Sequence, residues 1–138
     1  MSYKIIGKYI KDLKFSIPNP KTFFLLSKNI SNYKINVDIK SNQVKENIIE
    51  VLTAIILSPT INNNDQIETR IVYSTIIELN GKIEKQQLEK IVLIEVPTEI
   101  YSELRRIFVS LFENSGFKNI KINEKVDFKQ LYDSRNIQ

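Results

Sequence analysis

The sequence predicts an α+β fold in which a four-stranded antiparallel sheet is followed by two helices packed on one of its faces. Three observations lead to this prediction. Alternating or β-branched stretches fill the first 79 residues, turn signals separate them, and the apolar period becomes helical after residue 96. The 138 residues show no linker and no internal repeat, so we expect one domain spanning residues 1–138.

The expected strands are residues 3–15, 33–40, 44–57 and 66–79. The second alternates cleanly, with Tyr33, Ile35 and Val37 inward, which is typical of a strand with one buried face. The first carries apolar residues on both faces, so we expect it either to be covered on both sides or to pair with a second subunit. It is expected to end at Pro18, because proline cannot donate a hydrogen bond to a strand ladder.

Residues 21–32 are expected to form an irregular connection between the first two strands. This connection contains four consecutive large apolar residues, Phe23, Phe24, Leu25 and Leu26. Two interpretations stay open for them. They either plug the core or form an apolar surface that binds another molecule.

The second half of the chain predicts helices. Residues 84–90 are expected to form one or two helical turns, and Pro97 is expected in the first turn of a longer helix. Gly116 is expected to end this helix as a left-handed cap, and Asp127 to cap the start of a second, short helix. The longer helix carries an apolar stripe formed by Ile100, Leu104, Ile107, Phe108, Leu111 and Phe112.

The composition argues against catalysis. The chain has no cysteine and no histidine, which removes thiolate nucleophiles, histidine bases and the usual zinc ligands. Its three glycines, Gly7, Gly81 and Gly116, stand too far apart to form a loop that cradles phosphate. We therefore expect that the protein is not an enzyme and uses no metal or cofactor.

The net charge of +4 has two interpretations, a nucleic-acid surface or a general drift in composition. The lysines are scattered and form no basic run, which favours the second, so we expect no nucleic-acid partner. No apolar stretch reaches the roughly 18 residues that a membrane span needs. The start does not resemble a signal peptide, and we expect no membrane insertion and a cytoplasmic location.

Several motifs resemble those of the bacterial export chaperone SecB. The segment from Tyr9 to Asn19, YIKDLKFSIPN, resembles the signature of the first SecB strand. Later segments match the family in the same order, namely Leu93 to Pro97, a helix with Arg105 and Arg106, Ser115 to Phe117, and Val126 to Tyr132. The resemblance covers nearly the whole chain, although the middle strands match only in pattern.

The resemblance implies a homotetramer, a dimer of dimers that acts as an ATP-independent holdase. Such a chaperone binds unfolded precursor proteins in apolar grooves, keeps them competent for export and delivers them to the translocation ATPase SecA. The positions that line the groove in the family correspond here to Phe23, Phe24, Leu25, Leu26, Phe117, Phe128, Leu131 and Tyr132.

The resemblance also implies a docking surface for SecA, which the family builds from acidic residues on the sheet face. Asp12 matches one of them, whereas Ser16 follows Phe15 where the family pattern has Glu. In the fourth strand the acidic position falls on Ile71, and the nearby Glu68 is a substitute. Unlike the acidic export members of the family, this chain is basic.

Other functions remain open beside the export holdase. The weakened acidic face favours a SecB-like chaperone with another client, such as the antitoxin of a toxin–antitoxin pair. Two further alternatives are a basic module that binds nucleic acid and an α+β domain that binds a small molecule. Binding to nucleic acid would fall steeply with salt, whereas apolar binding of an unfolded client would not.

Overall fold

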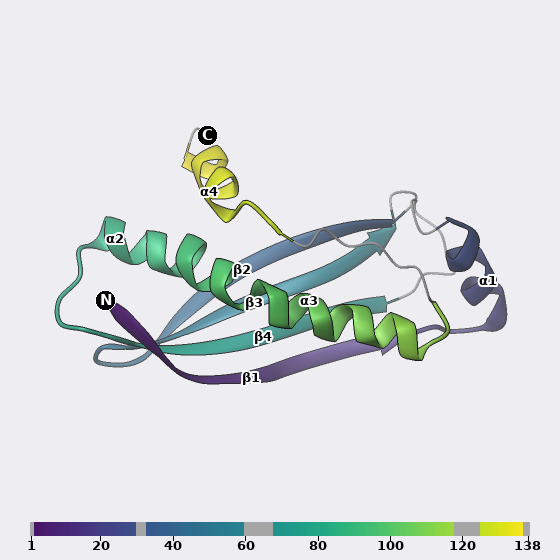
Figure 1. Cartoon of the computed structure of the whole chain (residues 1–138), viewed down its shortest axis with the longest axis horizontal. Helices are drawn as coiled ribbons and strands as arrows, with labels where there is room; N and C mark the ends of the chain where they lie inside the picture. The colour runs from purple at the N-terminus through teal and green to yellow at the C-terminus, as the bar shows by residue number, and fades with distance from the viewer. Residues whose placement is uncertain (1, 30–32, 60–67, 118–124, 137–138) are drawn as a thin grey trace.

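A computed structural model describes residues 2–29, 33–59, 68–117 and 125–136, with side chains placed over 2–24, 35–57, 69–117 and 125–134 (Figure 1). Its sheet contains four antiparallel strands in the order β1-β4-β3-β2, which confirms the expected antiparallel sheet. The outer strands β1 and β2 therefore form its two edges. The strands are β1 (Tyr3–Ser16), β2 (Tyr33–Lys45), β3 (Ile48–Pro59) and β4 (Glu68–Leu79).

The expected irregular connection after β1 is wrong over most of its length, because Pro20–Asn29 forms helix α1. Asn19 precedes this helix, and its Oδ1 accepts hydrogen bonds from the Thr22 backbone N–H at 2.8 Å and from Thr22 Oγ1 at 3.0 Å. Asn is a preferred N-cap, and Pro20 stands at the first helical position, where its missing N–H costs nothing. The residues that stop the strand thus also start a helix.

The hairpin between β2 and β3 turns later than the sequence pattern predicts. We expect β2 to end at Lys40, but it continues to Lys45 through a register shift between Gln43 and Lys45. The chain reverses direction at Asn47, which has a φ of 65°. Asparagine tolerates this left-handed conformation better than most residues.

The long helix begins earlier than expected. Helix α2 (Lys85–Lys90), the π-helical turn η2 (Ile91–Glu95) and α3 (Val96–Asn114) follow one another without a break. Pro97 stands in the first turn of α3, as expected, but α2 and η2 extend the helical run on its N-terminal side. Proline removes a backbone donor and crowds the preceding turn, and the wider π turn lies directly before it.

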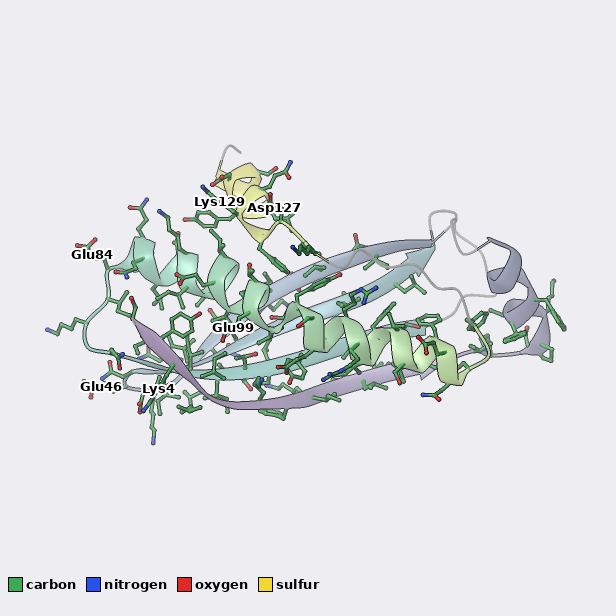
Figure 2. The ribbon with its side chains drawn as sticks, viewed as in Figure 1. Lys4, Glu46, Glu84, Glu99, Asp127 and Lys129 are labelled. Atoms are coloured by element: carbon green, nitrogen blue, oxygen red, sulfur yellow. The ribbon has the colours of Figure 1, made fainter. Side chains whose placement is uncertain are left out.

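The ends of the helices agree better with the sequence pattern. Gly116, with a φ of 96°, follows α3, and the Phe117 N–H donates to the Phe112 carbonyl at 2.9 Å. Helix α4 (Phe128–Asn136) starts beside Asp127, whose Oδ1 accepts the Gln130 backbone N–H at 2.9 Å (Figure 2). Both caps confirm the predicted helix boundaries.

Helix α3 packs across one face of the sheet and buries the main core beneath it (Figure 1). From the sheet, Ile55 and Ile71 are fully buried, and from the helix Leu104 and Phe108 are fully buried against them. The opposite face, which we call the open face, presents exposed charged residues, including Asp12, Lys14 and Arg70. The two faces are therefore chemically distinct.

Candidate functional site

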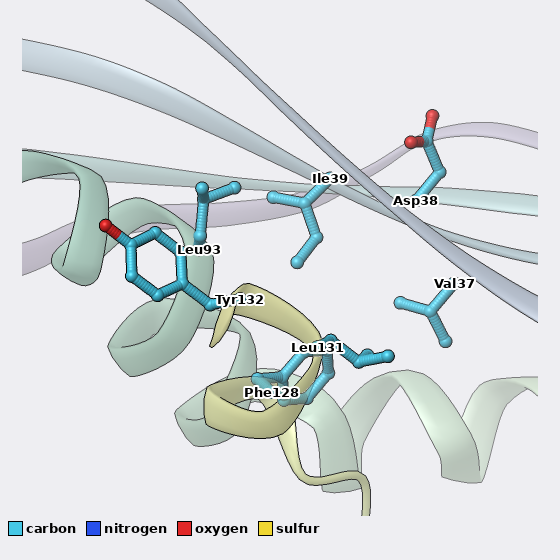
Figure 3. A pocket seen from close by; sticks show the side chains of 7 residues that line it. All are labelled: Val37, Asp38, Ile39, Leu93, Phe128, Leu131 and Tyr132. Carbon is cyan, nitrogen blue, oxygen red and sulfur yellow. The ribbon is translucent and has the colours of Figure 1, made fainter. Parts of the chain in front are cut away.

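A cavity of about 360 Å³ lies between the β2 edge of the sheet, η2 and α4 (Figure 3). In Figure 3, Val37 and Ile39 of β2 point toward α4, whereas the Asp38 carboxylate points away from it. Its lining residues, mostly apolar, are Val37, Asp38, Ile39, Leu93, Phe128, Leu131 and Tyr132.

Helix α4 is anchored on two sides of this cavity, which fixes its apolar face toward β2. The buried Phe128 ring lies 6.0 Å from the Tyr101 ring of α3 in an edge arrangement. The buried Tyr132 reaches α2, where its hydroxyl donates to Glu89 Oε2 at 3.2 Å. Between these anchors Leu131 is 51% exposed. The cavity thus has a fixed apolar wall and one large side chain open to solvent.

A second apolar patch, which we call the α1 patch, lies where α1 meets the end of α3. The Phe23 ring lies 4.8 Å from Phe117 and 5.6 Å from Phe24, measured between ring centroids. It also approaches Gly116 so closely that a Cβ at that position would lie 3.3 Å from the ring. Phe24, in contrast, is 62% exposed. Of the two interpretations of this segment, Phe23 fits a plug and Phe24 an open surface.

The eight side chains expected to line one groove fall into these two regions. Phe128, Leu131 and Tyr132 line the cavity, while the α1 patch comprises Phe23, Phe24 and Phe117. The side chains of Leu25 and Leu26 lie outside the described residues. The cavity also includes Val37, Ile39 and Leu93, which the sequence does not predict as site residues. Their alternation and apolarity indicated only core residues, and no local signal marks β2 as an edge strand.

The four positions expected to dock SecA differ in accessibility. Asp12 and Ser16 are exposed on β1. The side chain of Glu68 lies outside the described residues. Ile71 has no exposed surface because it faces α3 from β4, so the expectation that it contacts a docking partner is wrong. Since side chains alternate along a strand, its neighbour Arg70 occupies the open face instead.

Glu50 organises the polar centre of the open face. Its carboxylate accepts hydrogen bonds from Tyr9 Oη and Ser74 Oγ, both at 2.7 Å, and from Lys11 Nζ at 3.1 Å. These bonds lower the pKa of Glu50 to about 2, with the Tyr9 bond the largest cause. Glu50 therefore ties the edge strand β1 to β3 across β4.

Other polar contacts join β1 to the long helix. Glu103 of α3 accepts hydrogen bonds from Lys8 Nζ at 2.6 Å and from Tyr73 Oη at 2.9 Å, and the Lys8 bond is the main reason that the pKa of Glu103 is lowered. Tyr3 Oη donates to Glu99 Oε2 at 3.3 Å, and burial is the main factor that raises the pKa of Tyr3 to about 12. These contacts hold β1 in place, although no strand of the described residues pairs with its outer edge.

Strand β1 also carries exposed apolar side chains, including Ile6, Ile10 and Leu13. The cavity and the α1 patch offer further apolar surface, which is suited to non-covalent binding of apolar side chains. Among the helices described, none combines the length and apolarity needed to cross a membrane.

Comparison with known proteins agrees with this geometry. The family model described as "Preprotein translocase subunit SecB" matches residues 1–138. A provisionally named protein-export protein SecB of Pelagibacter ubique is 40% identical over 135 residues, with 97% of this chain and 96% of that protein covered. The protein-export protein SecB of Rhodospirillum rubrum is 28% identical, with 95% of this chain and 80% of that protein covered.

A solved structure of low identity has the same fold. It is a SecB-like chaperone of Mycobacterium tuberculosis in complex with a peptide from the HigA1 antitoxin. The two chains superpose with a TM-score of 0.67 at 10% identity, covering 91% of this chain and 88% of that one. Together with the match of the family model over the whole chain, these relatives show that the chain belongs to the SecB family of protein-export chaperones.

Proposed function

We propose that this chain is an ATP-independent holdase that keeps precursor proteins unfolded in the cytoplasm and delivers them to SecA. The observation that carries the proposal is the cavity between β2 and α4, where Leu131 stands half-exposed above an apolar wall. An unfolded client exposes apolar side chains that a folded protein buries. The cavity accepts such side chains without requiring a particular sequence, because apolar burial is non-directional.

The binding energy comes from apolar area, at roughly 25 cal/mol for each Å² removed from water. A large apolar side chain gains about 1.5–3 kcal/mol when it is fully buried, which is modest for one contact. The α1 patch, with the exposed Phe24, is the proposed second contact for the same client. A long unfolded chain that reaches several such sites binds more tightly through effective concentration.

Assembly into a dimer of dimers multiplies these sites. We place the first interface on the β1 edge, where Ile6, Ile10 and Leu13 are exposed and no described strand pairs with its outer side. An exposed apolar edge strand is a template for pairing with another chain. A second copy of the same strand satisfies both its backbone groups and its apolar side chains.

Light scattering coupled to size exclusion tests the holdase and the assembly together. The protein is run alone and mixed with a secretory precursor diluted from denaturant. We expect a tetramer that co-elutes with the unfolded precursor, and the same precursor in its folded form serves as the control. A monomer, or a tetramer that elutes apart from the unfolded precursor, would contradict the proposal.

Delivery to SecA is the finer part of the proposal, and Asp12 is its best-supported contact. Asp12 is exposed on the open face and matches an acidic position that the family uses for docking. We expect Asp12→Arg to abolish SecA binding in surface plasmon resonance and to spare client binding. Asp133→Arg, an exposed charge reversal on α4, is the matched control. Equal SecA affinity of both variants would exclude Asp12 from the dock.

A dedicated client such as an antitoxin is the second candidate function. It is favoured by the open face, where Arg70 is exposed and Ile71 is buried, so that the acidic docking positions are incomplete. A dedicated chaperone would prefer one client over unrelated unfolded precursors. Competition between two unrelated unfolded precursors for the same chaperone tests this, because a general holdase lets either displace the other.

A further inference from the structure

The open face can be described as rows of side chains that cross the four strands. One row runs Lys14, Arg70, Ile56 and Asn36, since these residues are paired from β1 through β4 and β3 to β2. The next row in the same register runs Asp12, Val72, Ala54 and Asp38. The first row therefore sets two cations side by side, next to an apolar side chain.

Lys14 and Arg70 are directly opposite each other on neighbouring antiparallel strands, and both are exposed. Like charges in this position repel each other and destabilise the sheet. Among the side chains that the structure places, neither forms an ion pair with a carboxylate. Among these placed side chains the repulsion is not offset by an ion pair, and an external anion would relieve it.

Two carboxylates of the open face already form ion pairs with lysines. Glu50 is bound by Lys11 at 3.1 Å, and Glu78 is bound by Lys4 at 3.2 Å. The cation pair of the first row thus stands apart from the internal ion pairs. Its apolar neighbour Ile56 is only partly covered, so the row offers two positive charges and one aliphatic contact.

We propose that the Lys14–Arg70 row docks an acidic segment of a partner protein that carries an aliphatic side chain beside its carboxylates. This docking site lies on the opposite side of the sheet from the core under α3 and goes beyond the holdase function. The row is narrow, because Asp12 and Asp38 follow in the next row and repel an extended polyanion. A nucleic acid, whose affinity depends on many phosphate contacts, fits this surface less well than a short acidic peptide.

A titration with a fluorescent peptide tests the docking site. The probe is a short fluorescein-labelled peptide of repeated Glu-Glu-Leu units, followed by anisotropy at low and at physiological salt. The test variant is the double reversal Lys14→Glu and Arg70→Glu. Its matched control is the double reversal Lys82→Glu and Lys85→Glu, which changes the net charge equally at exposed positions beyond the far end of β4. The neutral double variant Lys14→Gln and Arg70→Gln removes both positive charges without adding negative ones, so it still tests the site if the charge reversal impairs folding.

We expect the Lys14 and Arg70 reversal to weaken peptide binding by about tenfold, since each exposed ion pair contributes modestly and reversal adds repulsion. The neutral variant should lie between it and the wild type, and the control should bind like the wild type. Equal losses in the test and control reversals would overturn the proposal, because they would reveal only general charge attraction. Tighter binding of a single-stranded DNA oligonucleotide than of the peptide would overturn the partner class. Co-elution with unfolded precursor, retained in all variants, keeps this test separate from that of the holdase.

Discussion

The cavity beneath α4 and the α1 patch are both apolar, but they are built differently. In the cavity, Phe128 and Tyr132 anchor the helix, and Leu131 projects between them over β2. In the α1 patch, Phe23 packs against Phe117, whereas Phe24 is mostly exposed and no described pocket includes it. The cavity can enclose a client side chain, whereas the patch can only cover one side of it. We therefore propose that local support decides which apolar surface binds a client more strongly.

Truncation of Phe128 gives the largest expected effect. This ring is buried against Tyr101 of α3 and anchors α4 there. Phe128→Ala should therefore destabilise the protein by about 3–5 kcal/mol. It should also remove one wall of the cavity and weaken client binding. Denaturant unfolding and client titration measure the two effects. Unchanged stability would mean that α4 does not depend on this anchor.

Glu50→Gln should lower stability without touching either apolar region. Loss of the charged acceptor of three hydrogen bonds should cost about 1.5–3 kcal/mol. Client affinity per folded molecule should stay the same, which separates loss of fold from loss of binding. Glu78→Gln, which breaks only an exposed pair with Lys4, is the control and should cost less than about 1 kcal/mol.

The pH dependence of stability follows from the same carboxylate. The pKa of Glu50 is about 2 in the folded protein against an ordinary value of 4.5, so the folded state binds its proton less readily than the unfolded state. The stabilisation is present above pH 4.5 and is lost as the pH falls through about 2. Acid titration of the unfolding midpoint should be flatter in Glu50→Gln than in the wild type.

Truncation of Phe23 and of Phe24 should affect stability differently, because Phe23 is packed and Phe24 is exposed. Phe23→Ala should destabilise the protein by about 1–2 kcal/mol, because the ring loses its aromatic contact with Phe117 and part of its burial. Phe24→Ala should change stability by less than about 0.5 kcal/mol, because the ring is mostly exposed. Thermal unfolding of both variants checks this, and an equal loss would contradict the division of the patch.

Tyr132→Phe should give the smallest effect. It removes only the hydrogen bond to Glu89 and keeps the ring in the cavity wall, so the expected cost is about 0.5–1 kcal/mol. Client binding should change little, since the apolar surface is retained. A large loss of binding in a calorimetric titration would show that the hydroxyl, and not the ring, is what the client needs.

Much of this fold could be predicted from local signals. Alternation identified the strands, and Gly116 and Asp127 marked helix ends because left-handed and N-cap positions restrict the residue type. Asn19-Pro20 was ambiguous, because the same residues that end a strand also begin a helix. Pro97 correctly marks the first turn of α3, but no local signal predicts the π turn that joins α2 to it.

The candidate site could be predicted only in part. Leu131 and Tyr132 were assigned from the family resemblance and do line the cavity. Val37 and Leu93 join them through tertiary packing between an edge strand and a π turn, which no local pattern specifies. The prediction that Ile71 contacts a docking partner is wrong because side chains alternate along a strand. Ile71 faces α3, whereas its neighbour Arg70 is exposed on the open face.

The central claim is that the α4 cavity is the main binding site for unfolded clients. The most direct test compares the affinities of Leu131→Ser and Phe24→Ser for one unfolded precursor. We predict that Leu131→Ser weakens binding about fivefold, which corresponds to roughly 1 kcal/mol of lost apolar burial, and that Phe24→Ser has a smaller effect. Unchanged affinity in Leu131→Ser together with a large loss in Phe24→Ser would contradict the claim and would assign client binding to the α1 patch.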